Sequence, residues 1–267
     1  MAKSVTVVGP TILNTAALTE TELVAAGWTV PAGTRSILGV KISYTVNLVN
    51  DAVLPKVARV RVHSEDLKVE PCYIFAQGIG SHFTSGNGDQ SPARYFPLNI
   101  ACKGGEVIYF AGTQVVTTTT AGAMAVTVFF SDQSPSGGQY YYKTSAAVYA
   151  MPVTAALKTT DPTTYVVSGG KKITGVYGMV WGTIAAAATG IAGRFQLESP
   201  DFKTAFPVMW AVDRANSILS VGPVPIELCV ADDLDIPISD TTNVTQSVYN
   251  LSTTTAGAFI TGVQYQK

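Results

Sequence analysis

The sequence predicts an all-β protein made of two tandem eight-stranded jelly-roll (β-sandwich) domains related by internal duplication. Three observations lead to this prediction: strand-like segments fill most of the chain, helix-like segments are scarce, and segments near the start recur about half the chain later. The 267 residues suffice for two domains that each bury a core. About eight strands per half, joined by long loops, favour a jelly roll over an immunoglobulin-like sandwich, which is usually shorter.

Strand signals run along the whole chain. Segments rich in Val, Ile, Thr, Tyr and Phe are separated by Gly, Pro, Asp and Asn, as is typical of strands and turns. The first domain, 1–133, is expected to hold strands at about 3–9, 28–31, 36–49, 56–63, 69–77, 93–101, 105–113 and 122–131. The second domain, 134–267, is expected to hold strands at about 139–150, 164–167, 172–184, 190–198, 203–212, 222–230, 234–240 and 256–265.

The two halves match in register as well as in residue type. Segment 34–40 resembles 170–176, and segment 117–124 resembles 253–259. Further matched positions are Met124, Val126, Val128 and Phe130 with Phe259, Thr261, Val263 and Tyr265; Arg59, Ser64, Asp66 and Lys68 with Arg194, Ser199, Asp201 and Lys203; and 97–100 with 225–228. Because a one-residue slip would turn a core face to solvent, a repeat that keeps its alternation is expected to keep its fold.

Three segments depart from the strand pattern. The polar Gly/Pro/Ser segment 131–138 predicts a linker between the two domains. Segment 19–27 predicts a short helix, with Thr19 and Glu22 as a capping box and a glycine as its stop. Segment 78–92 has a shorter counterpart in the second half, so we expect it to form a surface loop peculiar to the first domain.

The composition limits the function classes. Apolar residues make up 47% of the chain and charged residues only 13%, so either the halves share a large interface or the protein works inside an assembly. A formal net charge of −1 and the absence of a basic arm argue against sequence-specific nucleic-acid binding. The N-terminus resembles no signal peptide and no segment is apolar for long enough to span a membrane, which predicts synthesis in a cytoplasm.

The three cysteines do not have metal-site spacing. Cys102 and Cys229 each lie near the end of an apolar run, which favours small buried side chains. A Cys72–Cys102 disulfide within the first domain is the alternative.

The candidate catalytic and binding groups are few. His63 and His82 are the only histidines; Ser81 precedes His82, but no nucleophile elbow or matched acid completes a triad. The acidic residues Asp232, Asp233 and Asp235 could ligate Ca²⁺, but their spacing is not that of an EF-hand and favours a solvated strand edge.

Two further motifs are equally unspecific. The segment 78–80 lacks the third glycine and the helix of a dinucleotide site. A stacking platform could be formed by Tyr140, Tyr141, Tyr142, Trp28, Trp181 and Trp210, although their spread over both halves favours core and interface positions. The sequence therefore predicts no catalytic residues, no cofactor and no metal site, and hence not an enzyme.

Two tandem β domains with jelly-roll strand counts resemble the double jelly-roll major capsid proteins of icosahedral DNA viruses. The resemblance covers essentially the whole chain and rests on architecture and duplication. It implies a virion structural protein, synthesised in the host cytoplasm, whose homotrimers form pseudo-hexagonal tiles of an icosahedral shell. It also implies contacts with other virion proteins and an underlying membrane. The predicted domains, 1–133 and 134–267, are small for such a tile, and no basic or amphipathic terminus is evident.

Two alternatives remain open. A turret, spike or vertex protein of a virion would carry the same tandem jelly rolls. A non-viral tandem β-sandwich that binds carbohydrate would use the aromatic residues and the 78–92 loop instead, and would act as a monomer or small oligomer.

Overall fold

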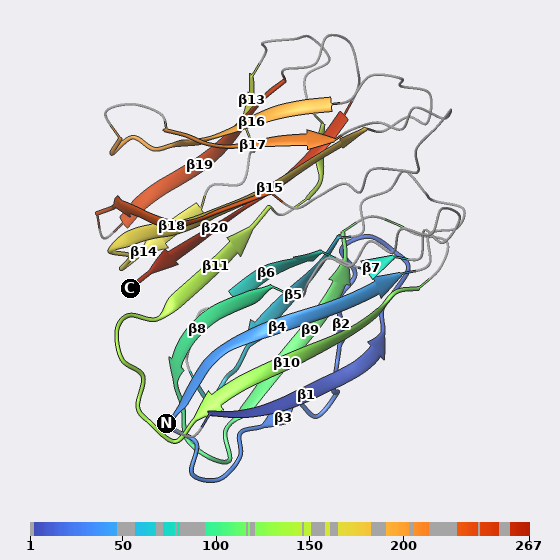
Figure 1. Ribbon diagram of the computed structural model, residues 1–267, viewed down its shortest axis with the longest axis vertical. Helices are drawn as coiled ribbons and strands as arrows, with labels where there is room; N and C mark the ends of the chain where they lie inside the picture. The colour runs from blue at the N-terminus through green and yellow to red at the C-terminus, as the bar shows by residue number, and fades with distance from the viewer. Residues whose placement is uncertain are drawn as a thin grey trace.

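In the computed structural model, strands make up all the regular secondary structure of the described residues (Figure 1). The structure describes residues 3–46, 57–67, 72–77, 79–80, 94–115, 117, 121–145, 147–150, 158–160, 165–182, 191–202, 206–213, 229–239, 241–250 and 257–267. Within these ranges, no helix is long and apolar enough to cross a membrane.

The strands form two modules, β1–β10 and β11–β20. The strands of the first module are β1 (Lys3–Ile12), β2 (Thr21–Glu22), β3 (Trp28–Thr29), β4 (Ser36–Val46), β5 (Val57–His63), β6 (Cys72–Gln77), β7 (Ile79–Gly80), β8 (Tyr95–Ala101), β9 (Val107–Gln114) and β10 (Ala123–Ser131). Those of the second are β11 (Tyr140–Thr144), β12 (Tyr149–Ala150), β13 (Lys158–Thr160), β14 (Tyr165–Ser168), β15 (Lys172–Gly182), β16 (Ile191–Glu198), β17 (Phe206–Asp213), β18 (Cys229–Pro237), β19 (Thr241–Asn250) and β20 (Gly257–Gln266). The predicted boundary between residues 133 and 134 falls in the segment that joins β10 to β11, and as a boundary it stays a prediction.

Both modules have the strand order of a jelly roll. In the first, one sheet runs β1-β10-β4 with β8 and the short β7 also paired to β4, and the other runs β2-β9-β5-β6 with β3 on β9. In the second, one sheet runs β11-β20-β15-β18 with β12 on β20, and the other runs β13-β19-β16-β17 with β14 on β19. Apart from the short β7, the strands of the first order have counterparts among the described strands of the second, so the prediction of two duplicated jelly rolls is confirmed.

A β-bulge falls at the same place in both modules. The register of β4 with β10 skips Leu38, and the register of β15 with β20 skips Thr174. Each bulge is followed by a glycine, Gly39 or Gly175. These residues lie in the matched segments 34–40 and 170–176, so the repeat read in the sequence is a repeat of backbone irregularity as well.

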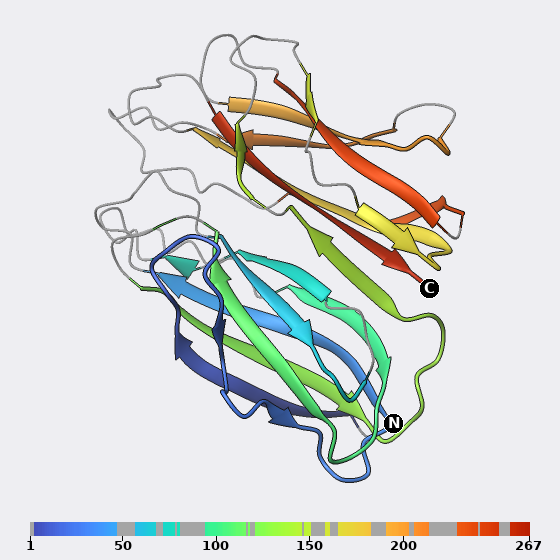
Figure 2. The same ribbon diagram turned by 180° about the vertical axis from the view of Figure 1, so that it is seen from behind.

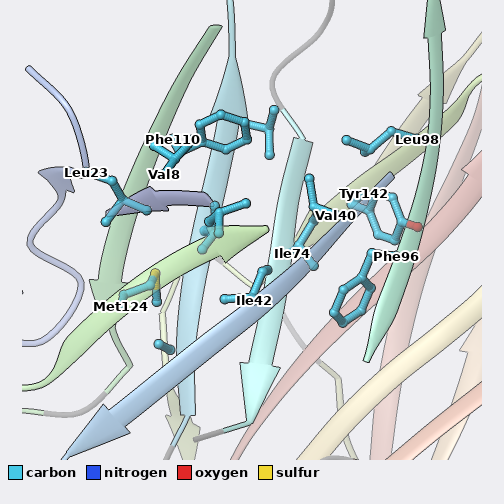
Figure 3. Packing of buried hydrophobic residues seen from close by; sticks show 14 of the residues in the cluster. Val8, Leu23, Val40, Ile42, Ile74, Phe96, Leu98, Phe110, Met124 and Tyr142 are labelled. Atoms are coloured by element: carbon cyan, nitrogen blue, oxygen red, sulfur yellow. The ribbon is translucent and has the colours of Figure 1, made fainter. Parts of the chain in front are cut away.

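Apolar residues alternate inward along the strands, as predicted. On β10, Met124, Val126 and Val128 are fully buried. On β5, Ala58 and Val60 are fully buried, while Arg59 between them is partly exposed. These side chains belong to the core of the first module. Figure 3 shows part of this core, including Met124. A second core, which includes Phe195, Val248 and Tyr265 among others, fills the second module.

The modules pack with one sheet of the second against one side of the first. In Figures 1 and 2 the modules lie one above the other, with β11 running between them. Residues 258–265 of β20 are all buried, because one face of this strand lines its own core and the other faces the first module. Tyr142, Tyr177, Ala258 and Ile260 of the second module accordingly belong to the core cluster of the first.

The predicted helix at 19–27 is wrong. Thr21 and Glu22 form β2 on β9, and the amide of Leu23 donates to the carbonyl oxygen of Phe110. The side chain of Leu23 is buried in the core, so sheet pairing and burial outweigh a local capping signal worth about 1 kcal/mol. Gly27, with a φ of 73°, does end the turn.

The second module differs from the prediction in its last third. The prediction missed β19, a ten-residue strand, and its strand at 234–240 overlaps the second half of β18, which begins earlier, at Cys229. The predicted strand at 222–230 lies outside the described residues except for its last two positions, which belong to β18. The strand that takes the place of β8 is β18, since Gly39 pairs with Pro97 and Gly175 pairs with Asp232. The predicted match of 97–100 to 225–228 is therefore wrong, and 225–228 lie outside the described residues.

Candidate functional site: the seam between the modules

An aromatic contact joins the two modules. Tyr142 on β11 reaches across to Phe96 on β8, with ring centroids 6.0 Å apart and nearly perpendicular planes. Tyr177 on β15 also contacts Phe96, at 6.2 Å. Figure 3 shows Tyr142 beside Phe96 and Leu98, at the open side of the first sandwich. We call Phe96, Tyr142, Tyr177 and Gln264 the seam.

Hydrogen bonds hold the seam in one geometry. The hydroxyl of Tyr142 donates to the carbonyl oxygen of Pro97 at 2.7 Å, and it accepts from Nε2 of Gln264 at 2.8 Å. The hydroxyl of Tyr177 donates to Oε1 of Gln264 at 3.1 Å. Burial raises the pKa of Tyr177 far above its usual range, so this hydroxyl remains a donor. A buried polar chain with these partners fixes how the modules sit on each other.

Hydrogen bonds from side chains of the first module to backbone carbonyl oxygens extend the seam on both sides. The Asn99 amide donates to the carbonyl oxygens of Ser136 and Gly138, which ties the linker to β8. The guanidinium of Arg59 donates to the carbonyl oxygen of Ser145 at 3.3 Å. The seam is thus held by both sheets of the first module.

An open cleft of about 400 Å³ lies beside the seam. Its walls carry Arg94, which pairs with Asp232, and Lys172, which pairs with Asp235 at 3.0 Å. Both pairs are well exposed, so each contributes about 0–1 kcal/mol. The prediction that the aspartates lie at a solvated strand edge agrees with their exposure on β18. Of the described residues, no three His, Cys, Asp or Glu side chains gather as metal ligands would.

His63 lies on the outer face of β5, away from the seam. Its Nε2 is 3.0 Å from Oε1 of Glu22, and its ring stacks on Tyr109 at 5.2 Å. Arg61 beside it pairs with Glu20 at 2.8 Å. The structure thus places His63 in a surface network of charges. Ser81 and His82, like most of the predicted loop 78–92, lie outside the described residues.

The remaining candidates are structural where the structure describes them. Cys102 is a free, buried thiol, which rules out the Cys72–Cys102 disulfide, and burial raises its pKa to about 11. Trp28 packs against Phe110 and Phe130 within the first module. The side chains of Cys72, Cys229, Trp181 and Trp210 lie outside the described residues.

The sequence indicated the seam in one respect only. Three successive tyrosines, 140–142, place aromatic side chains on both faces of β11, and such a strand is expected to be covered on both. The prediction of core and interface positions for these tyrosines is therefore confirmed for Tyr142. Nothing in the sequence pointed to Gln264 or Pro97.

No protein-family model matches the chain, and no curated protein matches it in sequence. Among solved structures, it is similar to a chain of Sulfolobus Turreted Icosahedral Virus, with a TM-score of 0.51, 10% identity, and 98% of this chain and 90% of that chain covered. The STIV major capsid protein gives a TM-score of 0.49 at 7% identity, covering 99% of this chain and 97% of that one. PNGase F of Flavobacterium meningosepticum, a glycosylasparaginase, gives 0.49 at 11% identity, covering 100% and 96%. Strand order and the likeness to the viral chain agree: this chain has the double jelly-roll fold.

Proposed function

We propose that this protein is a major capsid protein whose homotrimers form pseudo-hexagonal tiles of an icosahedral virion shell. The observation that supports this most is the pair of jelly rolls with one strand order, packed side by side within one chain. Three such chains around a threefold axis present six similar modules, which is the approximate sixfold shape that a hexagonal tile requires.

The surface chemistry supports the same proposal. Only 13% of residues are charged, and several large apolar side chains of the first module are exposed in the isolated chain. Such surfaces are expected where subunits cover each other in an obligate assembly. The other virion proteins, an underlying membrane and synthesis in the host cytoplasm belong to this proposal as expected surroundings.

The proposed role is structural and not catalytic. His63 is engaged with Glu22 and Tyr109, and the cleft beside the seam holds exposed ion pairs. A turret, spike or vertex protein would share the fold but not the tile. The carbohydrate-binding alternative has less support, because Trp28 packs inside the module and offers no stacking platform.

The test is the mass and outline of the purified protein. Multi-angle light scattering should give three times the chain mass of 28.0 kDa, and negative-stain images should show a hexagonal outline. Concentrated samples should form sheets or shells of these tiles. A folded monomer at all concentrations that is retained on a glycan array would contradict the proposal.

A further inference from the structure

The shared register allows the same sheet face to be compared in the two modules. In β1, Val5 pairs with Phe129 of β10, and in β11, Tyr142 pairs with Gln264 of β20. Phe129 and Gln264 in turn pair with the glycines that follow the two bulges. Val5 therefore occupies in the first module the place that Tyr142 occupies in the second.

These equivalent positions have different surroundings. Tyr142 is 2% exposed because the first module covers it, whereas Val5 is 54% exposed and Val7, two residues on, is 59% exposed. Ile12 on the same face is 64% exposed. Phe129 contacts the exposed ring of Tyr95 at 5.4 Å. We call Val5, Val7, Ile12, Tyr95 and Phe129 the outer apolar face.

In the second module, the sheet face equivalent to the outer apolar face is covered by the first module. The face formed by β11, β20 and β15 packs on the side of the first module where β6 and β8 are the outermost strands of their sheets. The counterparts of β6 and β8 in the second module are β17 and β18, which are also outermost. The chain thus contains one contact between a sheet face and a sandwich edge. Among the described residues, no edge packs on the equivalent face of the first module, and no sheet face packs on the β17–β18 edge of the second.

We propose that the outer apolar face of one chain binds the β17–β18 edge of a second copy of this chain. The contact between chains repeats the contact within the chain, so modules alternate around a ring. A head-to-tail contact of this kind closes into a ring when the rotation permits. The inference rests on the proposed function, which it deepens by naming the surface through which the tile assembles.

The chemistry of the face suits such a partner. Apolar side chains exposed along an edge strand mark interaction sites or aggregation hazards, and natural proteins seldom leave them uncovered. Lys41 stands where Tyr177 stands in the second module. The contact between chains is therefore expected to be more polar than the seam on this side and to come apart before the modules unfold.

Introducing negative charge on the outer apolar face provides the first test. Val5→Glu and Val7→Glu should convert the wild-type oligomer to a monomer in light scattering, while the circular dichroism spectrum stays unchanged. Val166→Glu is the matched control: Val166 is 44% exposed on β14, away from the outer apolar face, and this variant should keep the wild-type mass. If the Glu variants at positions 5 and 7 remain oligomeric, the inference is overturned while the proposed function stands. A folded wild-type monomer would overturn both.

A cross-link identifies the partner surface. Val7→p-benzoylphenylalanine, irradiated in a mixture of isotopically heavy and light chains, should attach between chains to peptides that contain 206–213 or 229–237. Attachment between chains to peptides of β1 or β10 would mean that two faces meet across a twofold axis, which overturns the proposed edge. Attachment within one chain only would likewise overturn it.

Discussion

Tyr142 connects the two modules through both parts of its side chain. Its ring contacts Phe96 in the first core, and its hydroxyl bridges the Pro97 carbonyl and the Gln264 amide. Tyr142→Phe keeps the ring but leaves two buried polar groups without this partner. We expect the free energy of unfolding to fall by about 1–2 kcal/mol in chemical denaturation. The control is Tyr109→Phe, on β9 beside His63, which should change the free energy of unfolding by less than about 0.5 kcal/mol. Equal effects of the two substitutions would contradict the role of the seam.

The two bulge glycines make a matched pair with unequal surroundings. A Cβ at Gly39 would strike the backbone carbonyl of Phe96, which the sheet holds in place, whereas a Cβ at Gly175 would meet the side-chain end of Gln264 at 2.6 Å. The paired strand cannot move, whereas Gln264 can move aside only by giving up its buried hydrogen bonds to Tyr142 and Tyr177. Gly39→Ala should therefore cost about 2–3 kcal/mol, and Gly175→Ala should cost less, about 1–2 kcal/mol.

Thermal denaturation of the two single variants tests this order. A larger loss for Gly175→Ala would mean that Gln264 is held more rigidly than the backbone of β8. It would also raise the expected contribution of the Gln264 hydrogen bonds to the seam.

At the scale of the strand, the alternation of apolar and polar residues was predictable where one face is buried and the other is exposed to solvent. Strands β5 and β10 have this pattern, and their predicted limits agree with the structure to within a few residues. Strand β19 was not predicted, because two of its buried positions are polar and break the apolar alternation between Val244 and Val248. Gln246 and Ser247 are fully buried, and Gln246 is accommodated by donating to the carbonyl oxygen of Gly262. Such pairing depends on a residue that is distant in space until the chain folds.

The central and edge strands should differ in amide exchange. Strand β20 is paired on both sides and buried on both faces, whereas β1, among the described strands, pairs with β10 alone and exposes Val5 and Val7. In dilute, monomeric protein the amides of β20 should exchange far more slowly than those of β1, with β10 between them. Hydrogen exchange read by mass spectrometry measures this order. Equal protection of β1 and β20 in the monomer would contradict the account of β1 as an open edge.

At the scale of the molecule, duplication predicted the modules but not their arrangement. The matched segments 34–40 and 170–176 fix equivalent bulges, yet nothing in them says which face meets which edge. The residues that decide this are those where the copies differ, such as Val5 against Tyr142 and Phe129 against Gln264. The residues that the two copies share predict the fold of each module, whereas the residues in which they differ decide how the modules pack.

The shared core predicts that the two modules unfold together. Tyr142, Tyr177, Ala258 and Ile260 come from the second module but pack in the core cluster of the first, so the first core is incomplete without the second module, and these four side chains lose their cover without the first. Calorimetry of the wild-type protein should give a single transition. Tyr142→Ala removes the central contact, at a cost of about 3–5 kcal/mol, and should split the transition into two as the modules lose their coupling. Two separate transitions in the wild type would show that the seam joins the modules without coupling their unfolding. A Tyr142→Ala variant that melts in one step would show that other contacts couple the unfolding of the two modules.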